Sequence, residues 1–119
     1  MKNKEDKERL QHMKNAIEKI NRFTEDVDFD AFEKNEMIQD AVFKNLEIIG
    51  EAVNRILKRN PSFEKLISDA KAIISLRNQV IHVYDNVSDE NIWSIIINHI
   101  PKLKAEIDQL INENSIDEQ

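Results

Sequence analysis

The residues best suited to chemistry lie together in one run, Arg77-Asn78-Gln79-Val80-Ile81-His82-Val83-Tyr84. An arginine guanidinium is always charged and binds phosphate through two parallel hydrogen bonds. A histidine, with an unperturbed pKa of about 6.5, can take up or release a proton near neutral pH. Arg77 and His82 together could therefore move a phosphoryl group without a metal ion.

The spacing within this run limits how its side chains can meet. On a regular helix Arg77 and Tyr84 share one face, whereas His82 lies about 140° around the axis from Arg77. Two arrangements would bring them to one target. The helix could end near residue 80 and turn His82 back, or two copies of the run could face each other across a two-fold axis. The second arrangement supplies two histidines, one for each proton of an acid–base reaction.

Composition predicts a single helical domain over residues 1–119. The chain has one glycine and two prolines, too few for the turns of an all-β fold. It has no cysteine, which excludes disulfides and thiolate chemistry. No apolar stretch approaches the roughly 18 residues of a membrane span, and the N-terminus is too polar for a signal peptide. We therefore expect a cytoplasmic protein with no contact to a membrane.

The net charge of −6 argues against broad, nonspecific nucleic-acid binding. The charge is unevenly spread, because residues 44–77 carry seven basic and four acidic side chains. That segment is therefore +3 and the remainder −9, which is compatible with a local contact to RNA.

Apolar residues at helical spacing predict an all-α, up-and-down bundle of four main helices, with a possible short fifth. The expected helices cover residues 4–26, 36–59, a third segment from Ser62 past residue 80, and a fourth from Ser88 onward. The short extra turn is expected at residues 29–35. Pro61 should end the second helix and Pro101 should kink the fourth. The tail at residues 114–119 is expected to fray.

The order Arg, Asn, three residues, His, one residue, Tyr resembles the motif of HepT-like toxins, which are ribonucleases of the HEPN superfamily. Residues 39–52 (QDAVFKNLEIIGEA) resemble the long second helix of that family. Residues 17–20 (IEKI) and the helix from Trp93 through 100–104 (IPKLK) match its usual layout. The resemblance covers roughly residues 10–110. One departure is Val83, where relatives often have glycine between the histidine and the tyrosine.

The resemblance implies a homodimeric endoribonuclease that cuts RNA without a metal, with its cleft between protomers. It also implies a partner, an MntA-like nucleotidyltransferase antitoxin that silences the toxin by transferring AMP to the motif tyrosine. By position, Arg77 and His82 would be catalytic, Asn78 a supporting polar residue and Tyr84 the modified hydroxyl. No cofactor or metal is implied.

Simpler interpretations stay open beside this one. Arg77 and Asn78 could be solvated helix residues, His82 a helix-end residue that binds carbonyls, and Tyr84 a half-buried tyrosine. The whole chain could then be a noncatalytic helical module that docks a nucleotidyltransferase.

Several residues outside the run have two interpretations. Asp40, Lys44, Glu47, Glu51 and Lys58 form a polar stripe at helical spacing, which is typical of a solvated face. Alternatively, Asp40 and Glu51 line a dimer cleft near Arg77.

For the other distinctive residues outside the run, structural roles are expected. Gly50 indicates a close helix crossing, or else the close approach of a partner's backbone. Trp93 is expected in the core or an interface rather than in a base-stacking platform. His12 and His99 have no ligand spacing, so no metal site is expected.

Overall fold

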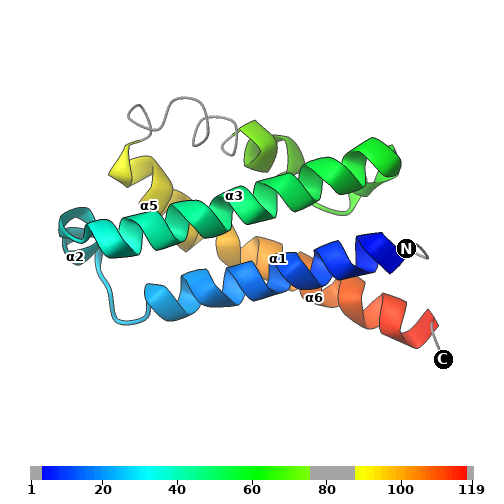
Figure 1. Ribbon diagram of the computed structural model, residues 1–119, viewed down its shortest axis with the longest axis horizontal. Helices are drawn as coiled ribbons and strands as arrows, with labels where there is room; N and C mark the ends of the chain where they lie inside the picture. Colours follow the sequence, from blue (N-terminus) through cyan, green and yellow to red (C-terminus); the bar gives the residue numbers. More distant parts are fainter. Residues whose placement is uncertain (1–3, 76–87, 118–119) are drawn as a thin grey trace.

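Two long helices, α1 (Lys4–Phe23) and α3 (Glu36–Arg59), lie side by side along the molecule (Figure 1). The computed structural model describes residues 4–75 and 88–117. Each helix buries one stripe of apolar side chains at spacings of three and four, as an amphipathic helix does. The buried residues of the two stripes include Leu10, Met13, Ile17 and Ile20 from α1, and Val42, Leu46, Ile49, Val53 and Ile56 from α3.

The connection between α1 and α3 carries the predicted short helix, α2 (Phe29–Lys34). α1 was expected to reach residue 26 but ends at Phe23, and Asp26 has a φ of 59°, which no right-handed helix tolerates. Asp28 caps α2 by accepting a hydrogen bond from the Ala31 amide at 2.8 Å. Asn35 then caps α3 through the Ile38 amide at 3.1 Å.

The segment after α3 differs from the prediction. α3 ends at Arg59 as expected, and η1 (Pro61–Lys65), a 3₁₀ helix, follows it. Ser62 was predicted to cap the third helix, and this was wrong. Ser62 lies inside η1 and donates its hydroxyl to Asn60 Oδ1 at 2.6 Å. α-Helical structure resumes only at residues 70–75.

The last helical segment is interrupted near Pro101, as predicted. α5 (Asp89–Asn98) and α6 (Ile100–Asp117) are separated at His99. Pro101 has no amide hydrogen to donate to the carbonyl four residues earlier, which disfavours a continuous helix. Ser88 caps α5 as predicted, by accepting from the Asn91 amide at 3.1 Å. The expected fraying after Glu113 stays a prediction.

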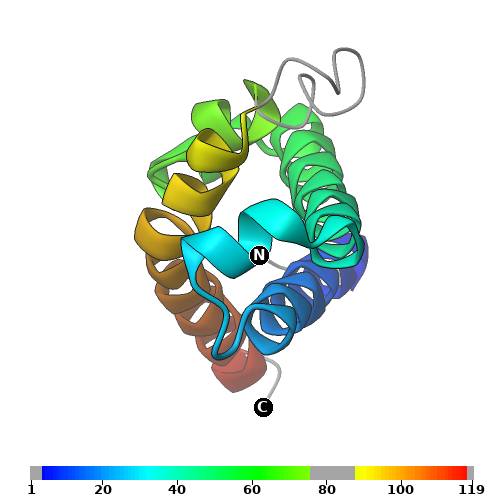
Figure 2. The same cartoon turned by 90° about the vertical axis from the view of Figure 1, so that its left-hand side faces the viewer.

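The helices enclose one apolar core. α6 packs on α1 and α5, and α2 packs on α3 and α5. Figure 2, the end-on view, shows α2 lying across the near end of the bundle. Trp93 of α5 is half-buried and contacts the Phe32 ring with centroids 5.3 Å apart, which confirms its predicted role in the core. Gly50 is buried within α3.

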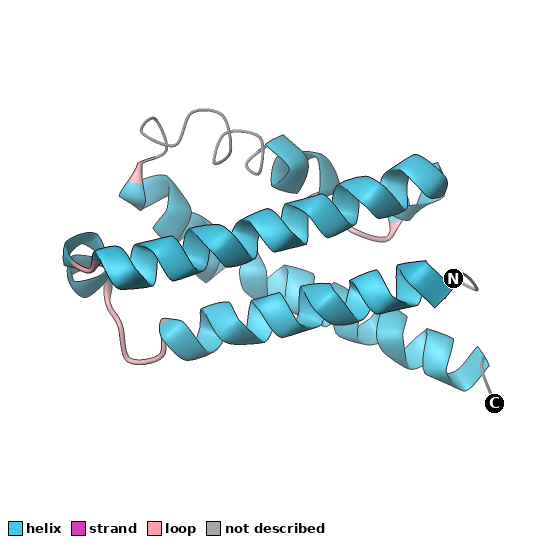
Figure 3. Ribbon diagram, viewed as in Figure 1, coloured by secondary structure: helices cyan, strands magenta, loops and turns pink. Residues whose placement is uncertain are grey.

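The predicted all-α bundle is confirmed: within residues 4–75 and 88–117 every regular element is a helix (Figure 3). None of the helices in these two ranges is both long and apolar enough to cross a membrane.

Candidate functional site

The predicted catalytic run lies outside the described residues. This holds for Arg77, Asn78, His82 and Tyr84, and for Val83 between the last two. Their predicted roles therefore stay predictions. What the structure describes is the chain on either side of the run, up to Ser75 and again from Ser88.

Both flanks of the run are built on buried side chains. On the N-terminal side Ile67 and Ala70 are fully buried, and Ile73 and Ile74 pack against the core. On the C-terminal side the capped helix α5 buries Ile92 and Ile96. Residues 67–74 and 92–96, which flank the run in the sequence, are therefore anchored in the bundle by their apolar side chains.

The N-terminal flank also has a polar attachment to α6. Asp69 Oδ2 lies 2.9 Å from His99 Nδ1 and 2.8 Å from Lys102 Nζ. The hydrogen bond from Lys102, and then that from His99, lower the pKa of the Asp69 carboxyl, and partial burial opposes them. The neighbouring Ser68 amide donates to Glu106 Oε2 at 3.0 Å. The carboxylate of Asp69 is therefore held in its charged form.

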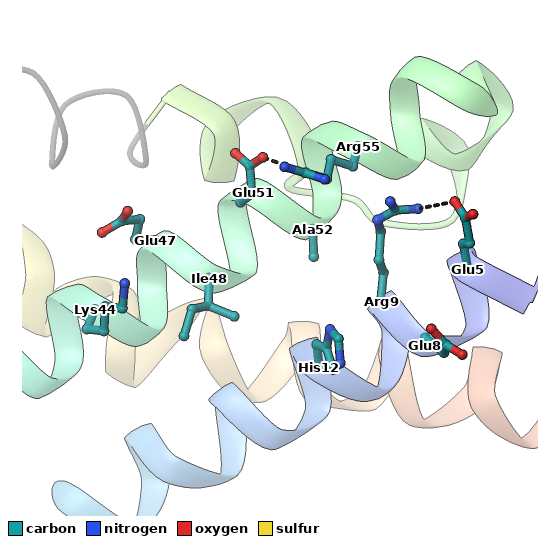
Figure 4. Close-up of a pocket in the computed structure, with 10 residues that line it drawn as sticks. All are labelled: Glu5, Glu8, Arg9, His12, Lys44, Glu47, Ile48, Glu51, Ala52 and Arg55. Atoms are coloured by element: carbon teal, nitrogen blue, oxygen red, sulfur yellow. Dashed lines mark hydrogen bonds and ion pairs between the residues drawn. The ribbon is translucent and has the colours of Figure 1, made fainter.

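A groove of about 420 Å³ lies between α1 and α3 (Figure 4). Arg9 and His12 rise from α1 toward α3, while Ile48 and Ala52 point from α3 toward α1. The groove is lined by Glu5, Glu8, Arg9, His12, Lys44, Glu47, Ile48, Ala52, Glu51 and Arg55. Most of its lining residues are ionisable, and Ile48 and Ala52 are the two apolar ones.

The guanidinium groups in this groove are paired with nearby carboxylates. Arg55 Nε donates to Glu51 Oε1 at 2.6 Å, and Arg9 Nη1 lies 3.3 Å from Asp6 Oδ1. Glu5 Oε2 contacts Arg59 at 2.7 Å, and that hydrogen bond and charge lower the pKa of the Glu5 carboxyl. Since these arginines are already paired, the groove is a weaker phosphate-binding site than an unpaired arginine would make.

The predicted polar stripe of α3 is a solvated face, because its five side chains are exposed or partly exposed. Three of them, Lys44, Glu47 and Glu51, also line the groove. The alternative that Asp40 and Glu51 approach Arg77 stays a prediction, since Arg77 lies outside the described residues.

His12 was weighed only as a metal ligand, and Arg9 was predicted in no site. A signal was present, since Arg9 lies four residues before the buried Met13 and His12 four residues before the buried Ala16, at the border of the apolar stripe. Within the part of the chain that the structure describes, no cluster of histidine and acidic side chains could hold a metal ion.

Comparison with known proteins identifies the family. The model of the family described as "Ribonuclease HepT-like" matches residues 13–110, a span that includes the run from Arg77 to Tyr84. The chain belongs to the HepT-like ribonuclease family. This confirms the resemblance drawn from the run and from residues 39–52, and it supports ribonuclease activity.

Relatives of this HepT-like chain carry consistent names. A Methanocaldococcus jannaschii protein provisionally named an RNase is 36% identical over 117 residues, covering 90% of this chain and 89% of the relative. A second from that organism, also provisionally named an RNase, is 38% identical over 72% of this chain and 78% of its own length. A Thermococcus cleftensis protein, provisionally named ribonuclease HepT, is 32% identical over 87% of this chain and 94% of its own length. No solved structure matches the chain significantly.

Proposed function

We propose that this protein is the toxin of a toxin–antitoxin pair, a homodimeric endoribonuclease that needs no metal ion. The observation that carries the proposal is the family match over residues 13–110, because the matched span contains Arg77, Asn78 and His82, whose side chains suit phosphodiester cleavage. A dimer would bring two copies of the run to one cleft and so supply two histidines.

The reaction follows from the residue types. One His82 takes the proton from a ribose 2′-hydroxyl, and the 2′-oxygen attacks the adjacent phosphorus. The bond from phosphorus to the 5′-oxygen breaks, and the second His82 or a water protonates that oxygen. Arg77 binds the phosphate and stabilises the charge that grows in the transition state, while Asn78 supports it through its polar side chain. The products are a 2′,3′-cyclic phosphate and a 5′-hydroxyl, and DNA is not a substrate because it lacks the 2′-hydroxyl.

Tyr84 is the proposed control point. A nucleotidyltransferase partner transfers AMP from ATP to the Tyr84 oxygen and releases pyrophosphate. On a regular helix Tyr84 shares a face with Arg77, so the attached phosphodiester would place a negative charge beside the guanidinium. The AMP would then exclude RNA from the cleft by both charge and volume.

The test compares the purified wild type with His82→Ala on total RNA in the presence of EDTA. We expect the wild type to leave 2′,3′-cyclic ends and His82→Ala to lose about 10²- to 10⁴-fold in rate, the usual contribution of a general base. His12→Ala is the matched control, since His12 is exposed in the α1–α3 groove and should cleave like the wild type. Equal cleavage by His82→Ala, or cleavage abolished by EDTA, would refute the mechanism.

The acidic net charge of −6 favours a second candidate, a noncatalytic module that docks the nucleotidyltransferase. Both candidates predict binding to such a partner. Only the ribonuclease predicts growth arrest when this chain is expressed alone, and mass spectrometry of the Tyr84 peptide in that experiment must show no AMP. An unmodified Tyr84 with no arrest and no cleavage would support the docking module.

A further inference from the structure

Three side chains of the α5–α6 region hold the turn that leads toward the predicted catalytic run. His99 and Lys102 both contact Asp69 Oδ2, at 2.9 and 2.8 Å. Glu106 accepts from the Ser68 amide at 3.0 Å. We call the contacts of Asp69 with His99 and Lys102 the Asp69 tether. Asp69 directly precedes the helical residues 70–75, and its own carbonyl accepts from the Ile73 amide at 2.9 Å.

The break between α5 and α6 gives His99 its position in the tether. The His99 amide donates to the Ile95 carbonyl at 2.9 Å, and its carbonyl accepts from the Leu103 amide at the same distance. His99 therefore closes α5 and opens α6, which places its ring against a turn that lies 30 residues earlier in the chain. Lys102, near the start of α6, joins the same carboxylate oxygen from that helix.

The tether is too exposed to be a major source of global stability. The side chains of His99 and Lys102 are 45% and 47% exposed, and ion pairs at that exposure contribute little to unfolding free energy. Their geometric effect is larger, because two donors on one carboxylate fix where residues 70–75 begin. The run starting at Arg77 follows two residues after that helical stretch.

We propose that Asp69, His99 and Lys102 are positioning residues for RNA cleavage, which act by fixing the start of the helical stretch that precedes Arg77. This inference rests on the proposed ribonuclease function. A displacement of about 1 Å in a catalytic group can cost about 100-fold in rate. Loss of the tether should therefore lower kcat much more than it lowers the thermal stability of the whole protein.

The variants are His99→Ala and Lys102→Met, each with a conservative counterpart. His99→Asn keeps an amide donor close to the position of Nδ1, and Lys102→Arg keeps the charge. Lys104→Met is the matched control, because Lys104 lies on α6 two residues further and pairs with Asp108 at 2.8 Å instead. Two readouts are taken on each full-length variant, amide hydrogen exchange at residues 70–75 and steady-state cleavage of RNA.

We expect His99→Ala and Lys102→Met to speed exchange of the Ile73 amide by about two- to fivefold, and to lower kcat by about tenfold with KM within about twofold of the wild type. Lys104→Met should match the wild type in both readouts, and His99→Asn and Lys102→Arg should restore most of the loss. Unchanged exchange in His99→Ala and Lys102→Met would overturn the tether itself. Faster exchange with unchanged kcat would overturn its positioning role.

The ribonuclease function and the positioning role of the Asp69 tether can be refuted separately. If the wild type cleaves no RNA, the proposed function is wrong, and the exchange rates still decide whether the tether fixes residues 70–75. If the wild type cleaves RNA and the variants cleave equally well, the ribonuclease stands and the inference about Asp69 is wrong.

Discussion

Phe63 should be one of the most sensitive positions of the fold, although it lies in a helix of only five residues. Its side chain is 0% exposed, and η1 connects the long helix α3 to the turn at Asp69. The Phe63 carbonyl also accepts from the Leu66 and Ile67 amides at 2.9 and 3.3 Å. Phe63→Ala therefore removes a buried ring from a turn whose backbone is already fixed by hydrogen bonds.

The expected loss can be worked from this burial. Removing a fully buried phenylalanine ring costs about 3–5 kcal/mol, since the cavity cannot collapse completely. A chain of 119 residues has a free energy of unfolding of about 6–18 kcal/mol, at the usual stability per residue. Phe63→Ala should therefore remove between a sixth and most of the total, whereas Phe63→Leu, which keeps much of the volume, should lose about 1–1.5 kcal/mol.

Urea unfolding measures this loss with two independent probes. Far-UV circular dichroism reports all helices, and the fluorescence of Trp93, the single tryptophan, reports α5. Coincident transitions justify a two-state analysis. Met37→Ala is the control, because Met37 is 84% exposed and should change stability by less than about 0.5 kcal/mol. A loss below about 1 kcal/mol for Phe63→Ala would refute the buried packing of η1.

Three further perturbations test other features. Ser88→Ala should destabilise the protein by about 1 kcal/mol in urea titration, because it removes the cap of α5, while Ser88→Asp should retain the stability. Because the folded-state pKa of Asp69 lies below its ordinary value of 3.8, its contribution to stability is complete above that pH and is lost as pH falls through the folded-state value. Acid titration should therefore destabilise the wild type more than Asp69→Asn below about pH 4. Gly50→Ala gains about 1 kcal/mol of helix propensity but adds a methyl group at a buried position, which costs about 1–3 kcal/mol; a lower unfolding midpoint is expected, and a higher one would show spare volume there.

Local signals predicted most helix boundaries. α3 begins and ends where the sequence places it, because Asn35 caps its start and Pro61 follows its end by two residues. Ser88 and Pro101 likewise act through their own backbone geometry, so they could be interpreted without knowledge of the fold. Where a residue determines structure within one helical turn, the sequence suffices.

The start of the third helical segment could not be predicted in this way. Ser62 after Pro61 has the composition of a helix start, but the helix resumes only at Ala70. The partners that hold the intervening turn are Glu106 and His99, 38 and 30 residues away from Ser68 and Asp69. Contacts at such separations leave no periodic pattern in the local sequence.

The motif residues of the candidate site could be predicted from the sequence, but the Asp69 tether could not. The order of Arg77, His82 and Tyr84 is a weak signal alone, but together with residues 39–52 it was sufficient to indicate the family. The Asp69 tether could not be predicted from the sequence. In a chain in which 34% of residues are charged, nothing adjacent to Asp69 or Lys102 distinguishes them from other charged surface residues.

The packing of α1 on α6 has a consequence for how the protein is made. Lys14 of α1 contacts Asp108 of α6 at 3.4 Å, and both helices bury side chains in the same core. A ribosome synthesises α1 first and α6 last, so α1 can pack on α3 well before it can pack on α6. Contacts between distant parts of a chain form late and slowly. The core can therefore be completed only after α6 has left the exit tunnel, and a nascent chain stalled at His99 would lack all the core side chains of α6.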